Sequence, residues 1–329
     1  MAEWLNFPFD PEIFALNWKE REDTDKLAIV QSGAMVEDPA IAALIANGSD
    51  TYTVPFYSVL ADDEDQNYDG KTDIALTEAK GESETGIVFG RAHGFKETEF
   101  VRDFNSGANP MAYTAAKTYE WWQRKEQQRL VGITMAALTS KGMESHVVSA
   151  ADTTEATVGD AIASVFGDQR DKITLAIMHS KVCRKLEQLQ LLEYKKYTDA
   201  QGIESRTHIA QLEGGVTVIE YDGVPTTDAS GDTKATYTTL LYTPGALRHA
   251  NAPVTTPAEV FRDPITNGGI NELLMRRRET IHPEGFSFKK PATGYTASPT
   301  DAQLFNKANW APVADPKTIG LAALVHTLD

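Results

Sequence analysis

The longest periodic pattern of apolar residues in the chain lies between positions 109 and 138. Apolar side chains recur there at three- and four-residue spacing, in a row that Glu126 interrupts midway. This spacing places them on one face of an α-helix, and Asn109 followed by Pro110 is a typical helix start. The segment therefore predicts a helix on the order of 40 Å long. The row consists of Ala115, Tyr119, Trp122, Leu130, Ile133 and Ala137.

Residues 1–103 carry shorter patterns, most of them extended. Asp38 and Pro39 mark the start of one short helix. Alternating segments rich in Tyr, Val and Phe lie near 51–60 and 85–93, on either side of an acidic stretch, and predict a long two-stranded hairpin. An isolated hairpin is only marginally stable in water, so we expect this one to lie on a neighbouring surface.

Residues 149–261 predict a separate α/β unit. Amphipathic helical patterns alternate there with short strands that are either fully apolar or alternating. The helices are expected over 157–172 and 179–192, and the strands over 173–178, 214–225 and 236–243. Together with the hairpin and the long helix, this unit predicts an α+β protein.

The acidic stretch DQNYDGKTD, residues 65–73, resembles two kinds of ligand-binding loop. It matches the opening of a calcium loop from Asp65 to Gly70, but the closing glutamate is replaced by Leu76 and the preceding segment is a strand. A phosphate-binding loop would need a glycine at Asp65. We therefore interpret the stretch as a solvated turn at the hairpin tip. The alternative is a calcium-dependent binding module that uses Asp65, Asn67, Asp69 and Asp73.

Composition is that of an ordinary folded protein of a reducing compartment. The 329 residues suffice for two domains or one large one, and 41% of them are hydrophobic, which is enough for a substantial core. No run reaches the roughly 18 apolar residues of a membrane span, and the N-terminal residues lack the pattern of a signal peptide. The single cysteine, Cys183, excludes an intramolecular disulfide and is expected to be buried.

The net charge of −16 is distributed unevenly along the chain. Up to Pro110 there are 8 Lys and Arg against 22 Asp and Glu, and the remainder holds 23 against 25. Such an acidic first third argues against nucleic-acid binding by that part. It fits segments that lie across a positive surface of another chain, and a solvated acidic face is the alternative.

The segment HSKVC offers the best candidate for nucleophilic chemistry. Ser180 follows a predicted strand and opens a predicted helix, as in a nucleophile elbow. The two glycines of that motif are absent, with Met178 and Val182 in their places. We therefore interpret Ser180 as a helix cap, and an α/β hydrolase that uses Ser180 or Cys183 with His179 is the alternative. The seven histidines are scattered, and none lies in a zinc-binding pattern.

Three consecutive arginines, Arg276, Arg277 and Arg278, lie in a predicted strand. Because successive side chains of a strand point to opposite faces, the three can hold partners on two sides. We expect them to anchor acidic groups of another subunit, and a phosphate-binding patch is the rival interpretation. The acids expected to meet them are Asp62, Asp63, Glu64 and Asp65.

Several short segments, spread in order over nearly the whole chain, resemble those of a known family. They are VQSGAM at 30–35, SGANPM at 106–111, LAIMHSKV at 175–182, RRRETIHPEGFSF at 276–288 and the stretch 298–328. The order of arm, hairpin, long helix, α/β unit and final strand region is similar too. The chain resembles the major capsid protein of tailed bacteriophages, of the Hong Kong 97-type fold, and especially the coat proteins of siphophages that infect Gram-positive bacteria.

The resemblance implies a division of the chain into named regions. These are an N-arm with a short helix at 1–48, an E-loop hairpin at 49–103, a P-domain with its spine helix at 104–148, an A-domain at 149–261, and the completion of the P-domain with a C-terminal strand at 262–329. In some family members a lysine is crosslinked to an asparagine. Lys71 and Lys80 lie in the E-loop region, but no local feature identifies a partner, so this chemistry is not expected here.

The resemblance also implies a structural rather than an enzymatic function, with no cofactor or metal. The expected partners are further copies of the chain in hexamers and pentamers, a separate scaffolding protein, a portal protein and, in some phages, decoration proteins. Double-stranded DNA is expected to be enclosed without specific binding, and no membrane is involved. The expected location is the virion head, assembled in the host bacterial cytoplasm. An encapsulin-type compartment shell is the alternative with the same fold.

Overall fold

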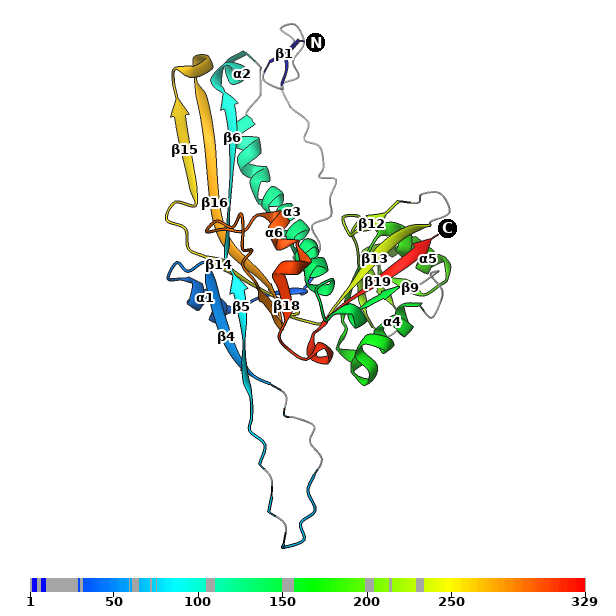
Figure 1. Ribbon diagram of the computed structural model, residues 1–329. Helices are drawn as coiled ribbons and strands as arrows, with labels where there is room; N and C mark the ends of the chain where they lie inside the picture. Colours follow the sequence, from blue (N-terminus) through cyan, green and yellow to red (C-terminus); the bar gives the residue numbers. More distant parts are fainter. Residues whose placement is uncertain are drawn as a thin grey trace.

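A computed structural model gives the structure of the chain. Figure 1 shows a long helix that lies along an extended sheet, a second sheet with its own helices at one side, and a hairpin that projects beyond both. The residues that the structure describes are 2–4, 7–9, 29, 32–58, 60, 65–71, 73–74, 76–104, 110–149, 157–198, 204–212, 215–228 and 234–328.

The extended sheet is built on one long strand, β16 (Ile270–Pro283). Along one edge, β16 pairs antiparallel with β6 (Phe89–Thr98). Along its other edge it pairs antiparallel with β15 (Ala258–Asp263) and then with β14 (Leu247–Ala252). The short strand β3 (Met35–Glu37) continues the sheet parallel to β14.

The long helix, α3 (Pro110–Leu138), confirms the predicted helix and lies along this sheet (Figure 1). Its C-terminal half is buried because both sheets contribute to one hydrophobic core there. Its N-terminal half lies beyond that core, so part of the predicted apolar row is wrong. The row is buried at Trp122, Leu130, Ile133 and Ala137 and exposed at Ala115 and Tyr119. The predicted cap, Asn109, lies outside the described residues.

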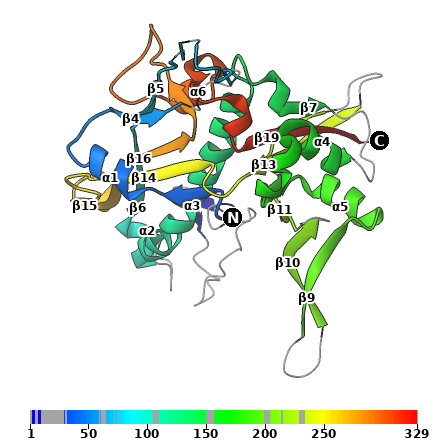
Figure 2. The same ribbon diagram turned by 90° about the horizontal axis from the view of Figure 1, so that it is seen from below.

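The second sheet has eight described strands, in the order β7–β19–β13–β8–β11–β10–β9, with β12 beside β13. Figure 2 shows β7, β19, β13, β11, β10 and β9 of this sheet, with α4 and α5 beside them. Its centre is antiparallel where β13 pairs with β19 and β8, and parallel where β8 pairs with β11. The strands are β7 (Val147–Ser149), β8 (Leu175–Met178), β9 (Leu192–Thr198), β10 (Glu204–Leu212), β11 (Thr217–Glu220), β12 (Thr226–Thr227), β13 (Ala235–Tyr242) and β19 (Leu321–Leu328).

Alternation along β8 explains how this sheet is covered on both faces. Ala176 and Met178 pack against helices α4 (Thr157–Phe166) and α5 (Ser180–Gln188). Leu175 and Ile177 point the other way, into the core that the end of α3 shares. Because successive side chains of β8 face opposite sides, the strand packs against α4 and α5 on one face and against the core shared with α3 on the other. The strand predicted over 173–178 and both predicted helices of this unit are confirmed.

The strand pairing divides the chain differently from the boundaries expected from the sequence. Residues 247–263, expected in the A-domain, form β14 and β15 of the extended sheet, and residues 89–98, expected in the hairpin, form β6 of the same sheet. The final strand, β19, belongs to the second sheet. The sheet to which each segment belongs is set by its pairing partner, which is β16 for β6, β14 and β15, and β13 for β19.

The projecting hairpin consists of β4 (Thr51–Tyr57) and β5 (Gly81–Ile87), paired antiparallel from Thr51 with Ile87 to Tyr57 with Gly81. Beside its root lies α1 (Pro39–Ile45), which Asp38 caps by accepting a hydrogen bond from the Ala40 N–H, as predicted. A small core of Ile41, Ile45, Tyr52, Val88, Ala250 and Ala252 holds the root and α1 on β14. Beyond the root, the hairpin extends away from the rest of the chain (Figure 1).

The remaining elements are short. They are β1 (Ala2–Trp4), β2 (Phe7–Phe9), α2 (Glu99–Phe104), β17 (Phe286–Phe288), β18 (Trp310–Pro312), α6 (Asp301–Leu304) and the 3-10 turns η1 (Glu144–His146), η2 (Gly167–Lys172), η3 (Thr266–Gly268), η4 (Lys307–Asn309) and η5 (Pro316–Thr318). Within the described part of the chain, no helix combines the length and the apolar character needed to cross a bilayer.

Candidate functional site

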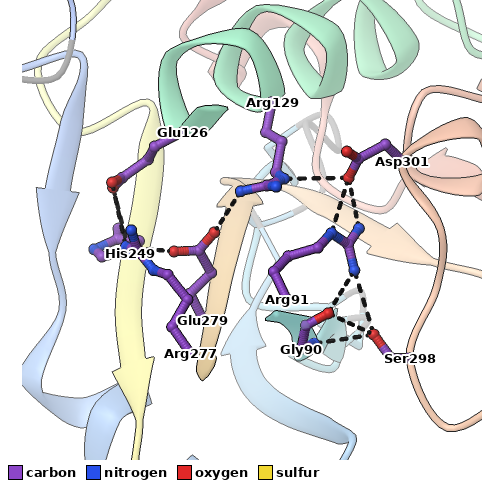
Figure 3. Close-up of polar contacts among 9 residues, drawn as sticks. All are labelled: Gly90, Arg91, Glu126, Arg129, His249, Arg277, Glu279, Ser298 and Asp301. Atoms are coloured by element: carbon purple, nitrogen blue, oxygen red, sulfur yellow. Dashed lines mark hydrogen bonds and ion pairs between the residues drawn. The ribbon is translucent and has the colours of Figure 1, made fainter. Parts of the chain in front are cut away.

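A buried network of ion pairs joins α3 to β16 (Figure 3). Glu279 of β16 is completely buried, and its two carboxylate oxygens lie 3.1 Å from Arg129 Nη1 of α3 and 2.6 Å from Arg277 Nη2. Arg277 Nη2 also lies 3.3 Å from Glu126 Oε2 of α3. Residues 277 and 279 share one face of the strand because side chains alternate, which directs both toward the helix.

The network continues to the first residue of α6, Asp301, and to Ser298 in the segment before it. Arg129 Nε lies 3.2 Å from Asp301 Oδ1, and Arg91 Nη2 of β6 lies 2.5 Å from the same oxygen. Ser298 accepts a hydrogen bond from the Gly90 N–H at 2.9 Å (Figure 3). The nearby arginines hold the pKa of Asp301 below its usual value despite partial burial, which raises that pKa. Four segments far apart in sequence are thereby fixed to one another.

Glu126, His249 and Glu279 are close enough to share a metal ion, with ligand atoms within 4.8 Å of one another. The charges of the network argue against a metal. Three carboxylates, of Glu126, Glu279 and Asp301, face three guanidinium groups, of Arg91, Arg129 and Arg277. A divalent cation would leave two positive charges uncompensated in a buried place, which is costly. Arg277 already neutralises the carboxylates that the metal would need.

Burial sets the protonation of the two central groups. It lowers the pKa of His249, whose Nε2 lies 3.6 Å from Glu126 Oε1, and so favours the neutral ring. It also raises the pKa of the Glu279 carboxyl, against the opposing effect of Arg277. Breaking one member of such a network would leave an unpaired buried charge, which costs about 3–5 kcal/mol. The network therefore makes the contact between helix and sheet specific.

The three arginines of β16 all have partners within their own subunit. Arg277 points to α3, whereas Arg276 and Arg278 are directed elsewhere, as the alternation predicts. Arg276 Nη1 lies 3.2 Å from Glu259 Oε2 of β15 at an exposed place, and Arg278 donates to the Ser49 carbonyl oxygen at 2.8 Å. Arg276 and Arg278 are thus the two that retain access to a neighbouring molecule.

The acids expected to meet these arginines belong to the segment of the chain between β4 and β5. Asp62, Asp63 and Glu64 are outside the described residues, and Asp65 is exposed. Asp69 accepts a hydrogen bond from the Lys71 N–H at 2.8 Å, and Gly70 has φ +70°, so this stretch forms a local turn. Among the described residues, the carboxylates of this stretch are not gathered closely enough to hold a metal ion.

The hairpin exposes apolar side chains that its own subunit leaves uncovered. Tyr57 and Tyr68 are each 88% exposed, and Leu76 is 90% exposed. Leu60 and Ile74 are also largely exposed. Scattered exposed apolar residues are normal on a protein surface, but several on one projecting element mark an interaction surface.

Asp222 provides His179 with the acid that the sequence did not reveal, at 3.5 Å from His179 Nδ1. The arrangement still differs from a catalytic triad. The Ser180 hydroxyl lies 3.5 Å from the same Nδ1 atom, which also accepts a hydrogen bond from the Lys181 N–H. A triad needs the acid and the nucleophile on opposite ring nitrogens. His179 is the cap of α5, and Cys183 is completely buried.

The chain is similar to known proteins both in sequence and in structure. A family model, major capsid protein 13-like (Gp13-like), matches residues 123–319. The major capsid protein of Bacillus phage SPP1 is 27% identical over 313 residues, which cover 93% of this chain and 92% of that protein. These matches span both sheets and most of α3.

Solved structures with very low sequence identity have the same fold. The head structure of Helicobacter pylori bacteriophage KHP40 matches with a TM-score of 0.55 and 11% identity over 99% of this chain and 96% of that one. The capsid of cyanophage Pam1 matches with a TM-score of 0.58 and 9% identity over 96% of each chain. An encapsulin from Synechococcus elongatus matches with a TM-score of 0.52 and 12% identity over 95% of this chain and 91% of that one.

The extended sheet with its long helix, the second sheet and the projecting hairpin define a protein of the Hong Kong 97-type fold. Within that class, the chain belongs to the major capsid protein 13-like (Gp13-like) family. It is the major capsid protein of a tailed bacteriophage, forms the icosahedral head by self-association, and is located in the virion.

The sequence did not predict the members of the buried network apart from Arg277. The available signal was the charged residue Glu126 in the middle of an apolar helical row. A buried charge needs a partner, so the interruption indicated one. The partners of Glu126 are Arg277 and His249, and these two and the other members Glu279 and Asp301 lie in segments distant from α3 and carry no local signal.

Proposed function

We propose that the subunit assembles into hexamers and pentamers chiefly through its hairpin, which lies on a neighbouring subunit. The observation that carries this proposal is the exposed apolar surface of the hairpin, with Tyr68 and Leu76 almost fully accessible. When a contact joins two different surfaces of identical subunits, repeating it gives a closed ring if the rotation from one subunit to the next divides a full turn evenly. Many modest contacts then add up in the closed shell.

The regions that we assign to this function follow the strand pairing. The N-arm precedes β3, the E-loop is the hairpin β4–β5, the P-domain is the extended sheet with its spine helix α3, and the A-domain is the second sheet with α4 and α5. In this assignment, the A-domain meets its copies at the centre of each capsomer, and the E-loop reaches outward to the next subunit.

At the contact between subunits, we propose that acids of the segment between β4 and β5 meet Arg276 and Arg278 of β16 on a neighbouring subunit. Asp65 is exposed, and Asp62, Asp63 and Glu64 precede it in the chain. Arg276 and Arg278 are the two basic partners, because Arg277 is engaged with Glu126 and Glu279 of its own subunit. Opposite charges across an interface fix its register more than they add affinity.

The further partners follow from the role of a phage head subunit. A separate scaffolding protein, a portal protein and, in some cases, decoration proteins would join the shell, which is assembled in the host cytoplasm. The double-stranded DNA is enclosed without specific binding, which agrees with the net charge of −16, because DNA affinity grows with the phosphates that a protein neutralises. No catalytic step is part of the proposed function.

Electron microscopy of the purified chain, alone and after co-expression with a scaffolding protein, tests the proposed function. The expected result is uniform hollow particles with five- and six-fold capsomers. A chain that stays monomeric under both conditions, with its hairpin folded onto its own body, would overturn the proposal.

A further inference from the structure

A cavity of about 770 Å³ lies beside the root of the hairpin. Its walls come from β4, β5, the turn between β16 and β17, and the segment that leads from β18 to η5. One part of the wall is apolar and long enough to cover the aliphatic part of a side chain. This part consists of Val54, Phe56, Val313, Ala314 and Ile319.

The other part of the wall is acidic. Four carboxylates, of Glu82, Glu84, Glu284 and Asp315, line the cavity, and Arg248 is the single cation among the described lining residues. Arg248 is shared among several acids. Its guanidinium lies 3.5 Å from Asp38 and 4.0 Å from Glu84 and makes a close contact with Glu284. One positive charge therefore faces five negative ones.

Two of the lining acids have no cationic partner among the described residues. Glu82 is exposed, and its neighbour across the strand pair is Phe56. Asp315 accepts a hydrogen bond from the Lys317 N–H at 2.9 Å, which is a backbone contact that caps η5. These two carboxylates are free to receive a cation without breaking any contact within the subunit.

Glu84 forms the inner end of the acidic wall. Its carboxylate is 5% exposed and accepts a hydrogen bond from the Gly285 N–H at 3.0 Å, and burial raises its pKa. Behind it lies His282, completely buried, with Nε2 4.0 Å from Glu84 Oε2. Burial also lowers the pKa of His282, so this ring does not compensate the acids at neutral pH. The excess of negative charge in the cavity is therefore carried mainly by the more accessible Glu82 and Asp315 rather than by Glu84.

An apolar wall beside unpaired carboxylates fits a lysine or arginine side chain, whose methylene groups lie on the apolar part and whose charged end meets the acids. Tyr57, 88% exposed, lies at the border between the cavity and the exposed part of the hairpin. A molecule that covers the hairpin is therefore also placed to reach the cavity.

We infer that this cavity receives a basic side chain from a second copy of the chain, which fixes the direction in which the hairpin leaves the body. This inference rests on the proposed function, since the hairpin of each subunit is expected to be covered by a neighbouring copy. Because the lining acids come from β5 and from the segment before η5, a basic group between them would tie the hairpin root to the rest of the subunit.

Carboxylate labelling tests the inference on the native chain. Isolated subunits and assembled particles are treated with a water-soluble carbodiimide and glycine methyl ester, and labelling is measured by mass spectrometry. We expect Glu82 and Asp315 to be labelled at least ten-fold less in particles, whereas Asp168, which is exposed on η2 and does not line the cavity, serves as the reference. Equal labelling of Glu82 and Asp315 in both states would overturn the inference while the particles uphold the proposed function. If no particles form, both fall.

A double variant separates binding of a cation from simple coverage by an apolar surface. Glu82→Gln with Asp315→Asn keeps the size of both side chains and removes two charges. We expect the concentration needed for assembly to rise at least ten-fold, whereas Glu120→Gln with Asp168→Asn, matched in charge and outside the cavity lining, leaves it unchanged. Unchanged or improved assembly of the cavity variant would contradict a basic occupant.

Discussion

The contact between α3 and β16 and the surface of the hairpin differ in how their side chains are satisfied. At the contact, buried charges meet buried or half-buried partners of their own subunit, and Glu279 alone faces two guanidinium groups. On the hairpin, Tyr68 and Leu76 are almost fully exposed and nothing described in the subunit covers them. The charged groups of the first region are paired within one subunit, whereas the apolar side chains of the second are covered only in an assembly.

This difference separates two properties that a shell protein needs. A rigid body must keep its shape in every position of the shell, and a specific buried network is suited to that. The connecting element must tolerate different neighbours, and a hairpin with a short root and an exposed surface is suited to that. Substitutions at the contact between α3 and β16 should therefore lower the stability of the subunit, whereas substitutions on the hairpin should impair assembly.

The largest loss of stability from a single substitution is expected for Glu279→Ala. It removes the carboxylate that Arg129 and Arg277 share, leaving Arg129 with only the more exposed Asp301 and Arg277 with only Glu126, so the free energy of unfolding should fall by about 3–5 kcal/mol. Chemical denaturation of the unassembled subunit measures this. The control, Glu259→Ala, removes the exposed partner of Arg276 on the same sheet and should cost at most about 1 kcal/mol. Equal losses for the two variants would show that the network is not stabilising.

A second large effect is expected from acid. Burial lowers the pKa of His282 and of His326 to about 4, from 6.5 in the unfolded chain. The folded state binds fewer protons than the unfolded state in this range, so stability is lost as the pH falls from 6.5 to about 4. Each histidine should contribute about 3 kcal/mol to that loss.

Denaturation between pH 7 and pH 4 measures the acid effect, with the variant His326→Gln as the comparison. The variant should lose less stability than the parent over this interval, because one of the two groups no longer titrates. Parallel curves for the two proteins would mean that His326 is accessible to protons in the folded state. Glu84 and Glu279, whose carboxyl pKa values are raised by burial, act in the opposite direction in both proteins and cancel in the difference.

Within β16, Arg278→Ala separates an effect on subunit stability from an effect on assembly. The side chain is half-buried and donates one hydrogen bond to the Ser49 carbonyl oxygen. Its loss should cost about 1 kcal/mol of subunit stability. If Arg278 meets acids of a neighbouring subunit, the yield of particles should fall by much more than this small change explains. Normal particles from the double variant Arg276→Ala with Arg278→Ala would remove these residues from the interface.

The smallest effect on the subunit is expected on the hairpin itself. Tyr68→Ser with Leu76→Ser changes two exposed side chains and should alter the free energy of unfolding by less than about 0.5 kcal/mol. The same variant should fail to form particles, because it removes apolar surface that a neighbour covers. Light scattering and electron microscopy measure assembly. A variant that assembles as the parent does would show that these two side chains are not at the interface.

Local patterns predicted the elements of the fold well, and long-range pairing was harder. The spine helix, the cap at Asp38 and the apolar strand of the second sheet were all visible in the sequence because each depends on neighbouring residues. The placement of β14, β15 and β19 was not, because an antiparallel strand of suitable composition can pair with any compatible edge. The exposure of Tyr119 was missed for the same reason: the sequence does not say where the core under a helix ends.

The candidate site was less predictable than the fold. The three arginines were found because they are adjacent, but their different roles depend on which face of β16 meets α3. Asp222 lies 42 residues after Ser180, and only the parallel pairing of β11 with β8 brings it to the start of α5. Contacts of this kind are properties of topology, which no local spacing encodes.

The position of β19 has a consequence for the order in which the polypeptide becomes competent. This strand, Leu321–Leu328, lies between β7 and β13 in the second sheet, although β13 ends at Tyr242. During synthesis, all the other strands of that sheet leave the ribosome long before the one that joins β7 to the rest. A nascent chain therefore leaves the facing edges of β7 and β13 unpaired until residues 321–328 emerge, so the second sheet is completed only when nearly the whole chain has been made.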